Sequence, residues 1–275
     1  MLVRLGHSPD PDDAFMFWAL AERRIDSRGF DFEFVHADIQ TLNSWALTGK
    51  LEVTAISLRT YPLVRERYLL LPHGASIGSG YGPVLVAREP LSLAELRDRD
   101  IVVPGRSTTA FLVLRLAFGE DFRSRELPFD QIIEEVKSGR ADAGLVIHEG
   151  QLTYASEGLV KVADLGEWWL LETGLPLPLG VNVARRDLGD ALPSLSAVLM
   201  DSIRAGLAAR RDALEYAMLF GRGLDPALAD RFVGMYVNDY TCDFGEEGRA
   251  AVRELLSRGR DAGLLDGSAD VEFAP

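Results

Sequence analysis

Two short apolar strands, each ending in a polar residue, constrain the fold of this chain most strongly. After Gly144, the apolar run at residues 145–147 ends abruptly at His148 and Glu149. In open α/β sheets the carboxyl ends of the strands face the ligand crevice, so the position favours a ligand-facing histidine. A histidine that is only hydrogen-bonded at a strand end is the plainer alternative.

The same order of elements occurs earlier in the chain. A helical run at residues 42–47 ends at Thr48 and Gly49, and a strand at residues 53–57 follows. Ser57 ends this strand as His148 ends the later one. Two such units predict two lobes of similar build, each offering a polar residue to a shared cleft.

Composition narrows the class of protein. The chain has 275 residues, which allows one or two domains. Its net charge of −13 argues against a nucleic-acid partner, because such binding depends on Lys and Arg. The single cysteine, Cys242, excludes an internal disulfide framework and a multi-cysteine metal site.

The N-terminal residues suggest where the protein works. The sequence opens on strand-like residues 2–5 and shows no basic stretch, apolar stretch or cleavage signature of a secretory signal. No apolar run approaches the thickness of a bilayer. We therefore expect a cytoplasmic protein with no membrane partner.

The loop from Ser8 to Asp13 predicts a ligand-facing edge. It joins the first strand to a helix expected from Ala14, with Asp12 or Asp13 as the N-cap. Its three acids would repel an anion, so the loop should meet hydroxyl groups or position other residues. An ordinary proline-rich turn is the alternative.

A second candidate site follows the strand predicted at residues 101–103. Arg106, Ser107, Thr108 and Thr109 precede an apolar helix at residues 111–118. Exposed N–H groups and hydroxyls at a helix start attract an anion, and Arg106 adds a guanidinium, so we predict a carboxylate site. In the alternative interpretation, Ser107 or Thr108 serves only as the helix cap.

These elements predict an α/β protein with two lobes and a ligand cleft between them. Residues 175–180 form a stiff extended segment suited to a crossing between lobes, and residues after 192 are mostly helical. Lobe one should hold residues 1–87 and 182–275, and lobe two should be residues 88–181, inserted into the first. The alternative is a single doubly wound domain with added helices.

Several motifs resemble those of the 1,4-dihydroxy-6-naphthoate synthase family of the futalosine route to menaquinone. They occur in family order along essentially the whole chain: residues 8–15 (SPDPDDAF), 104–110 (PGRSTTA), 144–149 (GLVIHE), 173–180 (TGLPLPLG) and 236–238 (YVN), followed by 245–248 (GEEG). The resemblance implies a fold like the type-2 periplasmic binding proteins, used inside the cell as an enzyme.

The resemblance also implies a reaction and a set of site residues. The reaction is cleavage of cyclic dehypoxanthine futalosine to 1,4-dihydroxy-6-naphthoate and dihydroxyacetone, a carbon–carbon lyase activity without cofactor or metal. His148 matches the proton-accepting histidine. The implied substrate-binding residues are Thr108 and Thr109 in one turn and Ala55, Ile56 and Ser57 at one strand end.

Three positions depart from the family pattern. Asp10 stands where cysteine is common, Asp12 where asparagine is common, and Ala55 where lysine is frequent. Losing a lysine and gaining acids weakens the attraction for an anionic substrate, while Arg106 and a helix N-terminus remain to bind it.

We therefore expect an enzyme that acts on a small anionic aromatic carboxylate. The carboxylate should dock at residues 107–109, Ser57 should bond a sugar or carbonyl oxygen, and His148 should act as general base. The nearest rival is a chorismate dehydratase of the same pathway. A non-catalytic cytoplasmic solute-binding protein is the rival from another class. Metal catalysis by His148 and Glu149 lacks the ligand spacing it needs.

Overall fold

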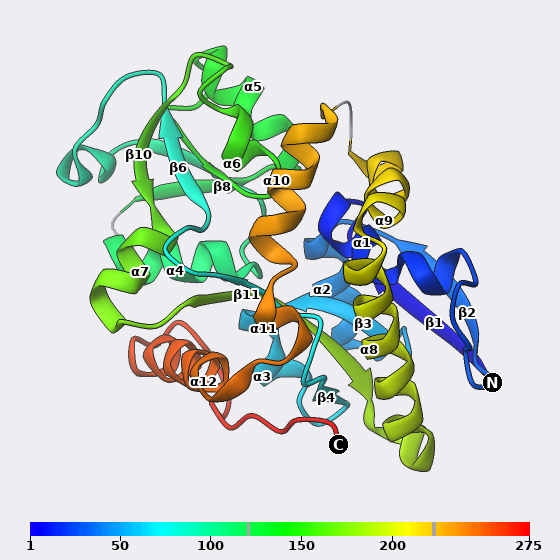
Figure 1. Ribbon diagram of the computed structural model, residues 1–275. Helices are drawn as coiled ribbons and strands as arrows, with labels where there is room; N and C mark the ends of the chain where they lie inside the picture. The colour runs from blue at the N-terminus through cyan, green and yellow to red at the C-terminus, as the bar shows by residue number, and fades with distance from the viewer. Residues whose placement is uncertain (120–121, 222–223) are drawn as a thin grey trace.

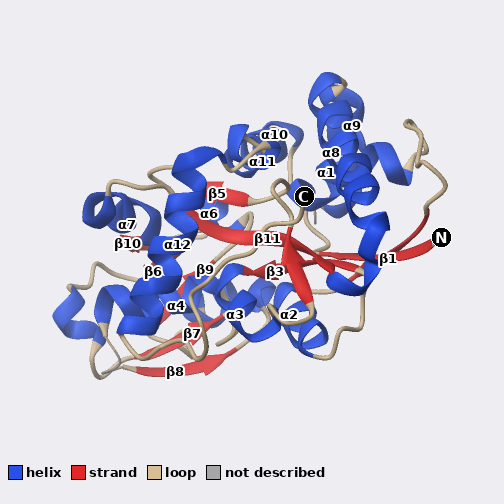
Figure 2. Cartoon of the chain, turned by 90° about the horizontal axis from the view of Figure 1, so that it is seen from below, coloured by secondary structure: helices blue, strands red, loops and turns tan. Residues whose placement is uncertain are grey.

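Two mixed β-sheets covered by helices build the molecule (Figures 1 and 2). The computed structural model describes residues 1–119, 122–221 and 224–275. The first sheet has the strand order β2-β1-β3-β11-β4, with β5 paired to β11, and the second has the order β10-β6-β9-β7-β8. The predicted α/β class is confirmed.

The strands of each sheet come from separate stretches of the chain. The first sheet contains β1 (Leu2–His7), β2 (Asp31–His36), β3 (Val53–Ser57), β4 (Tyr68–Leu70), β5 (Ser76–Gly78) and β11 (Leu177–Arg185). The second contains β6 (Val84–Ala87), β7 (Asp100–Val103), β8 (Arg123–Glu126), β9 (Ala143–Val146) and β10 (Val160–Asp164).

Helices cover both sheets. Those up to residue 173 are α1 (Pro11–Ala21), α2 (Ile39–Leu47), α3 (Tyr61–Val64), α4 (Thr109–Phe118), α5 (Ile132–Lys137), α6 (Gly150–Thr153) and α7 (Leu165–Thr173). The C-terminal helices are α8 (Leu192–Ala208), α9 (Arg210–Ala217), α10 (Pro226–Tyr236), α11 (Asp239–Cys242) and α12 (Gly245–Asp261). No helix in the described part of the chain is long and apolar enough to cross a membrane.

Sheet membership differs from the expected lobe boundaries. β6, placed by the sequence analysis in lobe one, pairs with β9 and β10 of the second sheet. The expected boundary at 181/182 falls inside β11, which pairs with β3 of the first sheet. Strand pairing therefore puts the two crossings at residues 79–83 and 174–176, a detail that apolar periodicity does not encode.

The start of α1 also differs from the expectation. The helix begins at Pro11, and its N-cap is Asp10 rather than Asp12 or Asp13. Proline is favoured at the first helical position because its φ is already helical and its missing N–H would be unbonded there. Asp12 and Asp13 consequently lie in the first turn, where the helix dipole stabilises negative charge.

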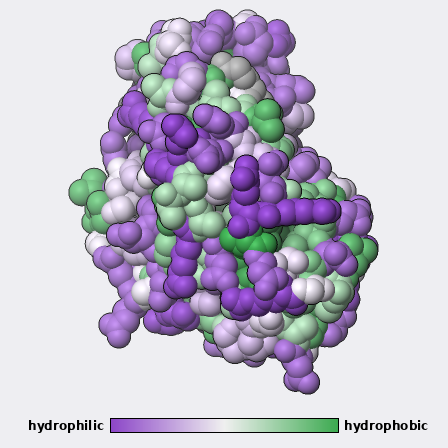
Figure 3. All heavy atoms as spheres, turned by 45° about the vertical axis from the view of Figure 1, so that its right-hand side comes forward, coloured by the Kyte–Doolittle hydropathy of each residue, from purple (hydrophilic) through white to green (hydrophobic). Residues whose placement is uncertain are grey.

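One buried apolar cluster joins the two sheets. It contains Ile56 and Val181 of the first sheet, Leu85 and Leu145 of the second, and Leu255 of α12. In Figure 1, α10 lies between the two lobes, and α12 packs against both α4 and β11. The C-terminal helices therefore connect the two lobes. The face of the molecule shown in Figure 3 is largely hydrophilic, with smaller apolar areas.

Gly144 lies in β9 where the strand packs closely against α5. A Cβ atom at this position would lie 2.6 Å from Ile132 Cγ2 and 2.8 Å from Val136 Cγ2, both on α5. Because the interior is closely packed, we predict that Gly144→Ala lowers the free energy of unfolding by about 1–3 kcal/mol, as measured by urea denaturation.

Gly234→Ala in α10 is the matched control. Gly234 is exposed, and a Cβ there would approach only the guanidinium of Arg210, at 3.4 Å. Alanine favours a helix interior over glycine, so this variant should be unchanged or up to about 1 kcal/mol more stable. Equal effects of the two variants would contradict the packing argument.

Candidate active site

A cleft between the lobes collects the polar strand and helix ends. It encloses about 690 Å³ of space, including the part open to solvent. The first part of the chain contributes Ser8, Asp10, Asp12, Asp13, Ile39, Ala55, Ser57, Gly74 and Ser76. The remaining lining residues are Pro83, Thr108, Thr109, Ala110, Ile147, His148, Gln151, Leu179, Gly180, Val181, Asn182, Phe232 and Tyr236.

His148 reaches the cleft in an uncommon backbone conformation. It follows the end of β9 with a φ of +53°, in the left-handed region that non-glycine residues rarely adopt. Its ring lies edge-on to Phe129, with centroids 4.6 Å apart. Such backbone strain persists only where the surroundings enforce it, and it is concentrated at functional sites.

Asp10 meets His148 from the other lobe. Its Oδ2 lies 2.9 Å from His148 Nδ1, and the two side chains are 2% and 15% exposed. Burial alone would raise the pKa of Asp10. The charge of the His148 ring and its hydrogen bond to Asp10 instead lower that pKa below its ordinary value. Asp10 is therefore ionised at neutral pH.

The other two acids of α1 carry protons more readily. Burial, followed by the charges of Asp10 and Asp13, raises the pKa of Asp12 well above its ordinary value. Burial and the Asp10 carboxylate raise the pKa of Asp13 to about 8. Asp13 also accepts a hydrogen bond from the Ser8 N–H at 2.8 Å, which closes the loop before α1.

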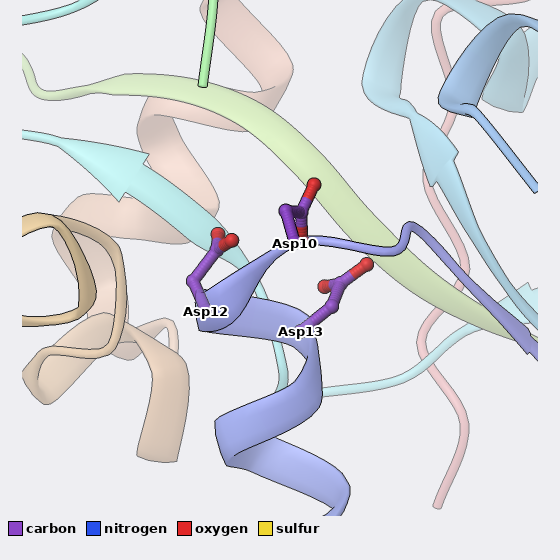
Figure 4. A group of neighbouring side chains, drawn as sticks. All are labelled: Asp10, Asp12 and Asp13. Atoms are coloured by element: carbon purple, nitrogen blue, oxygen red, sulfur yellow. The ribbon is translucent and has the colours of Figure 1, made fainter. Parts of the chain in front are cut away.

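The three carboxyl groups are also the candidate metal ligands among the described residues. They offer oxygens within 4.8 Å of one another, at the start of α1 (Figure 4). Two of the three favour their neutral forms, so the group offers a cation fewer charges than three carboxylates would. His148 already occupies one side of Asp10.

The N-terminus of α4 forms another wall of the cleft, and it carries partial positive charge where the start of α1 carries acids. Thr108 is its N-cap, and the Thr108 hydroxyl accepts from the Phe111 N–H at 3.2 Å. The Thr109 hydroxyl donates to the Leu179 carbonyl at 2.7 Å. The hydroxyls therefore serve the fold, as the capping alternative held, while the N–H groups of the first turn offer partial positive charge to an anion.

Strand β3 presents its alternate residues to the cleft. Ala55 and Ser57 line the cleft, whereas Ile56 points into the apolar core. Asn43 Nδ2 donates to Ser57 Oγ at 3.0 Å, so the Ser57 hydroxyl hydrogen remains able to donate to a ligand. Ile56, expected as a substrate contact, does not line the cleft.

Arg106 and Ser107 also differ from the expectation, because neither lines the cleft. The exposed Arg106 side chain donates to the Ser124 carbonyl at 2.9 Å, and its backbone N–H donates to Glu126 at 2.7 Å. Ser107 donates its hydroxyl to Gln40. Neighbouring β8 and α2 satisfy these groups, and a single turn motif cannot reveal such partners.

Sequence reasoning missed the residues that close the cleft. Phe232 and Tyr236 of α10 line it, and the Tyr236 hydroxyl is hydrogen-bonded to the side chain of Gln151 at 2.7 Å. Helical structure after residue 192 was expected, but nothing in the sequence pattern shows that α10 packs across the cleft. Trp169 is fully buried, and its indole N–H donates to the Pro176 carbonyl.

Comparison with known sequences identifies relatives along nearly the whole chain. Residues 3–261 match the family described as menaquinone biosynthesis. A 1,4-dihydroxy-6-naphthoate synthase of Thermus thermophilus is 43% identical over 264 residues, covering 95% of each chain. The Streptomyces coelicolor enzyme of the same name is 41% identical over 273 residues, covering 96% of this chain and 94% of its own.

Solved structures agree with the fold. A protein of Archaeoglobus fulgidus superposes with a TM-score of 0.92 at 46% identity, covering 96% of this chain and 98% of its own. A Candida albicans protein described as having the generic periplasmic binding protein fold has a TM-score of 0.75 at 12% identity, with 100% and 97% covered. The predicted periplasmic-binding-protein-like fold is confirmed.

The buried acids make stability depend on pH. A carboxyl group with a raised pKa contributes stability that is fully present below its unfolded-chain pKa, here 3.8, and is lost as the pH rises to its folded-state pKa, here about 8. Asp13→Asn removes this titration. We predict that the difference in melting temperature, variant minus wild type, becomes more positive as the pH rises from 5 to 8.

Asp201→Asn is the control, because Asp201 pairs with Arg28 at the surface, away from the cleft. The melting temperature of Asp201→Asn, plotted against pH, should run parallel to that of the wild type from pH 5 to pH 8. A parallel curve for Asp13→Asn as well would contradict the raised pKa of Asp13.

Proposed function

This chain belongs to the menaquinone biosynthesis family and is a lyase of the 1,4-dihydroxy-6-naphthoate synthase type, and we propose that His148 is its general base. The family resemblance carried by the sequence motifs is thereby confirmed. The observation that supports the proposal for His148 is its place in a cleft with an anion-binding helix end on one wall and a cluster of acids on another.

The two walls suggest how a substrate lies in the cleft. We propose that cyclic dehypoxanthine futalosine places its naphthoate carboxylate at the N-terminus of α4, where the partial positive charge of the helix end favours an anion. Its hydroxyl-bearing part then lies towards Ser57 and the acids of α1, which suit hydroxyl donors. Phe232 and Tyr236 offer aromatic faces beside the fused ring.

His148 suits the removal of a proton from this hydroxyl-bearing part. Because ionised Asp10 can only accept, Nδ1 of the neutral ring carries the hydrogen and Nε2 carries the lone pair. Nε2 takes a hydroxyl proton, the adjacent carbon–carbon bond breaks, and the electron pair of that bond passes into the fused ring system as an enolate. The proton held on Nε2 then returns to that enolate, and the ring becomes aromatic. Dihydroxyacetone leaves as the carbonyl fragment. Covering of the cleft by α10 keeps water away from the anion.

The lobe division and the setting of the enzyme are part of the proposal. We propose two lobes that meet along the cleft, with residues 1–78 and 177–275 in one and 84–173 in the other, following the two sheets. We also propose a small anionic aromatic carboxylate as substrate and a cytoplasmic location, as suits a biosynthetic enzyme whose relatives make a naphthoate.

Mass spectrometry of a reaction mixture tests the substrate. Incubation with cyclic dehypoxanthine futalosine should give 1,4-dihydroxy-6-naphthoate, and incubation with chorismate should leave chorismate unchanged. Conversion of chorismate alone would establish the dehydratase instead. Tight retention of the futalosine derivative without conversion would identify a solute-binding protein.

His148→Ala tests the base. A positioned general base contributes a factor of about 10² to 10⁴, so we predict that turnover falls by about this factor while the fold and product binding survive. The measurements are steady-state kinetics, circular dichroism and product titration.

His36→Gln is the matched control, because His36 lies outside the cleft and contacts His7. It should keep wild-type turnover. Wild-type turnover in His148→Ala would remove His148 from the role of base.

A further inference from the structure

We propose that Asp10 is a positioning residue that fixes the orientation and the tautomer of His148. The proposal rests on the role of His148 as general base. It is carried by a contact between the lobes, in which Asp10 Oδ2, before α1, lies 2.9 Å from His148 Nδ1, after β9. Asp10 acts through the imidazole, and the proton of the substrate passes to the opposite ring nitrogen.

Asp10 does not cap its own helix. Asp10 is the N-cap residue of α1 and has the extended backbone of one, yet its side chain makes no capping hydrogen bond. An N-cap aspartate normally bonds the N–H groups of the first turn and so stabilises the helix. Here the carboxylate is turned to His148 instead. A residue that forgoes a local stabilising contact for a distant one marks a functional constraint.

The backbone of His148 is held in a strained conformation. Its φ of +53° is one that non-glycine residues seldom adopt, so the surrounding structure must hold the residue there. A histidine in this region needs outside contacts to hold its ring in one orientation. Asp10 bonds one nitrogen and Phe129 packs edge-on against the ring. The ring is thus held from both lobes.

The charges around Asp10 and His148 leave Asp10 as the anion that faces the imidazole. The titratable groups near it are His7 of β1, Asp12 and Asp13 of α1, Glu149 beside His148, and Tyr236 of α10. Burial lowers the pKa of His7 to about 4, and its Nδ1 lies 2.8 Å from the Ser8 carbonyl, so His7 stays neutral and does not compete for Asp10. With Asp12 and Asp13 favouring their protonated forms, the negative charge of the loop is concentrated on Asp10.

The charge of Asp10 should affect the pH dependence of the reaction. A negative charge at Nδ1 stabilises the protonated imidazole, so it makes His148 a stronger base. Removing that charge should weaken the base and let it lose its proton at a lower pH. It should also admit the other tautomer, because an asparagine amide can donate as well as accept.

The test is the pH profile of kcat/KM for Asp10→Asn and Asp10→Glu. In Asp10→Asn we expect kcat to fall about ten- to hundredfold at neutral pH with little change in KM, and the acidic limb to move down by about one pH unit or more. Asp10→Glu retains the charge, so its acidic limb should stay near the wild-type position. Asp201→Asn removes a surface carboxylate and should match the wild type.

His148→Ala separates this inference from the proposed function. If that variant is inactive and Asp10→Asn keeps the wild-type acidic limb and kcat, Asp10 is not a positioning residue although His148 is the base. A loss of activity in Asp10→Asn with an unmoved limb would show a structural role only, and would equally overturn the inference. Full activity of His148→Ala would instead overturn the role of His148 itself.

Discussion

The contact between Asp10 and His148 holds the candidate site together, because each partner comes from a different sheet. Asp10 follows β1 of the first sheet and His148 follows β9 of the second, and the two meet at 2.9 Å. Both parallel pairs, β1–β3 and β7–β9, direct strand ends to the same cleft. The apolar cluster shared by the two sheets and α12 provides the support behind this meeting point. The pair therefore reports on the arrangement of the lobes as well as on chemistry.

The electrostatics of the cleft follow from two helix starts that carry opposite functions. The first turn of α4 has no acidic residue, so its N–H groups remain suited to an anion. The first turn of α1 carries Asp12 and Asp13, and burial with mutual repulsion favours protons on both. One end of the cleft thus suits a carboxylate and the other suits hydroxyl groups. The substrate orientation that we propose follows from this asymmetry.

Much of the architecture could be predicted from local patterns, and the chemistry of the loop before α1 could not. Apolar runs gave β1, β3 and β9, and the proline-rich segment at 175–180 correctly indicated a return to the first sheet through β11. Arg106 was misjudged because its partners, Ser124 and Glu126, lie on a neighbouring strand that the motif does not contain. The loop that holds Asp10 was expected to meet hydroxyl groups or to position other residues. Nothing in the sequence shows that Asp10 faces His148, because the two residues lie far apart in the chain.

The tautomer of His148 tests the central claim most directly. Nitrogen-15 NMR of histidine-labelled protein, with the His148 signals assigned by their loss in His148→Ala, distinguishes the two neutral forms of the ring. A hydrogen on Nδ1, bonded to Asp10, and a lone pair on Nε2 are the predicted result at a pH where the ring is neutral. A hydrogen on Nε2 would leave no lone pair on the nitrogen assigned to proton removal, and would contradict the account.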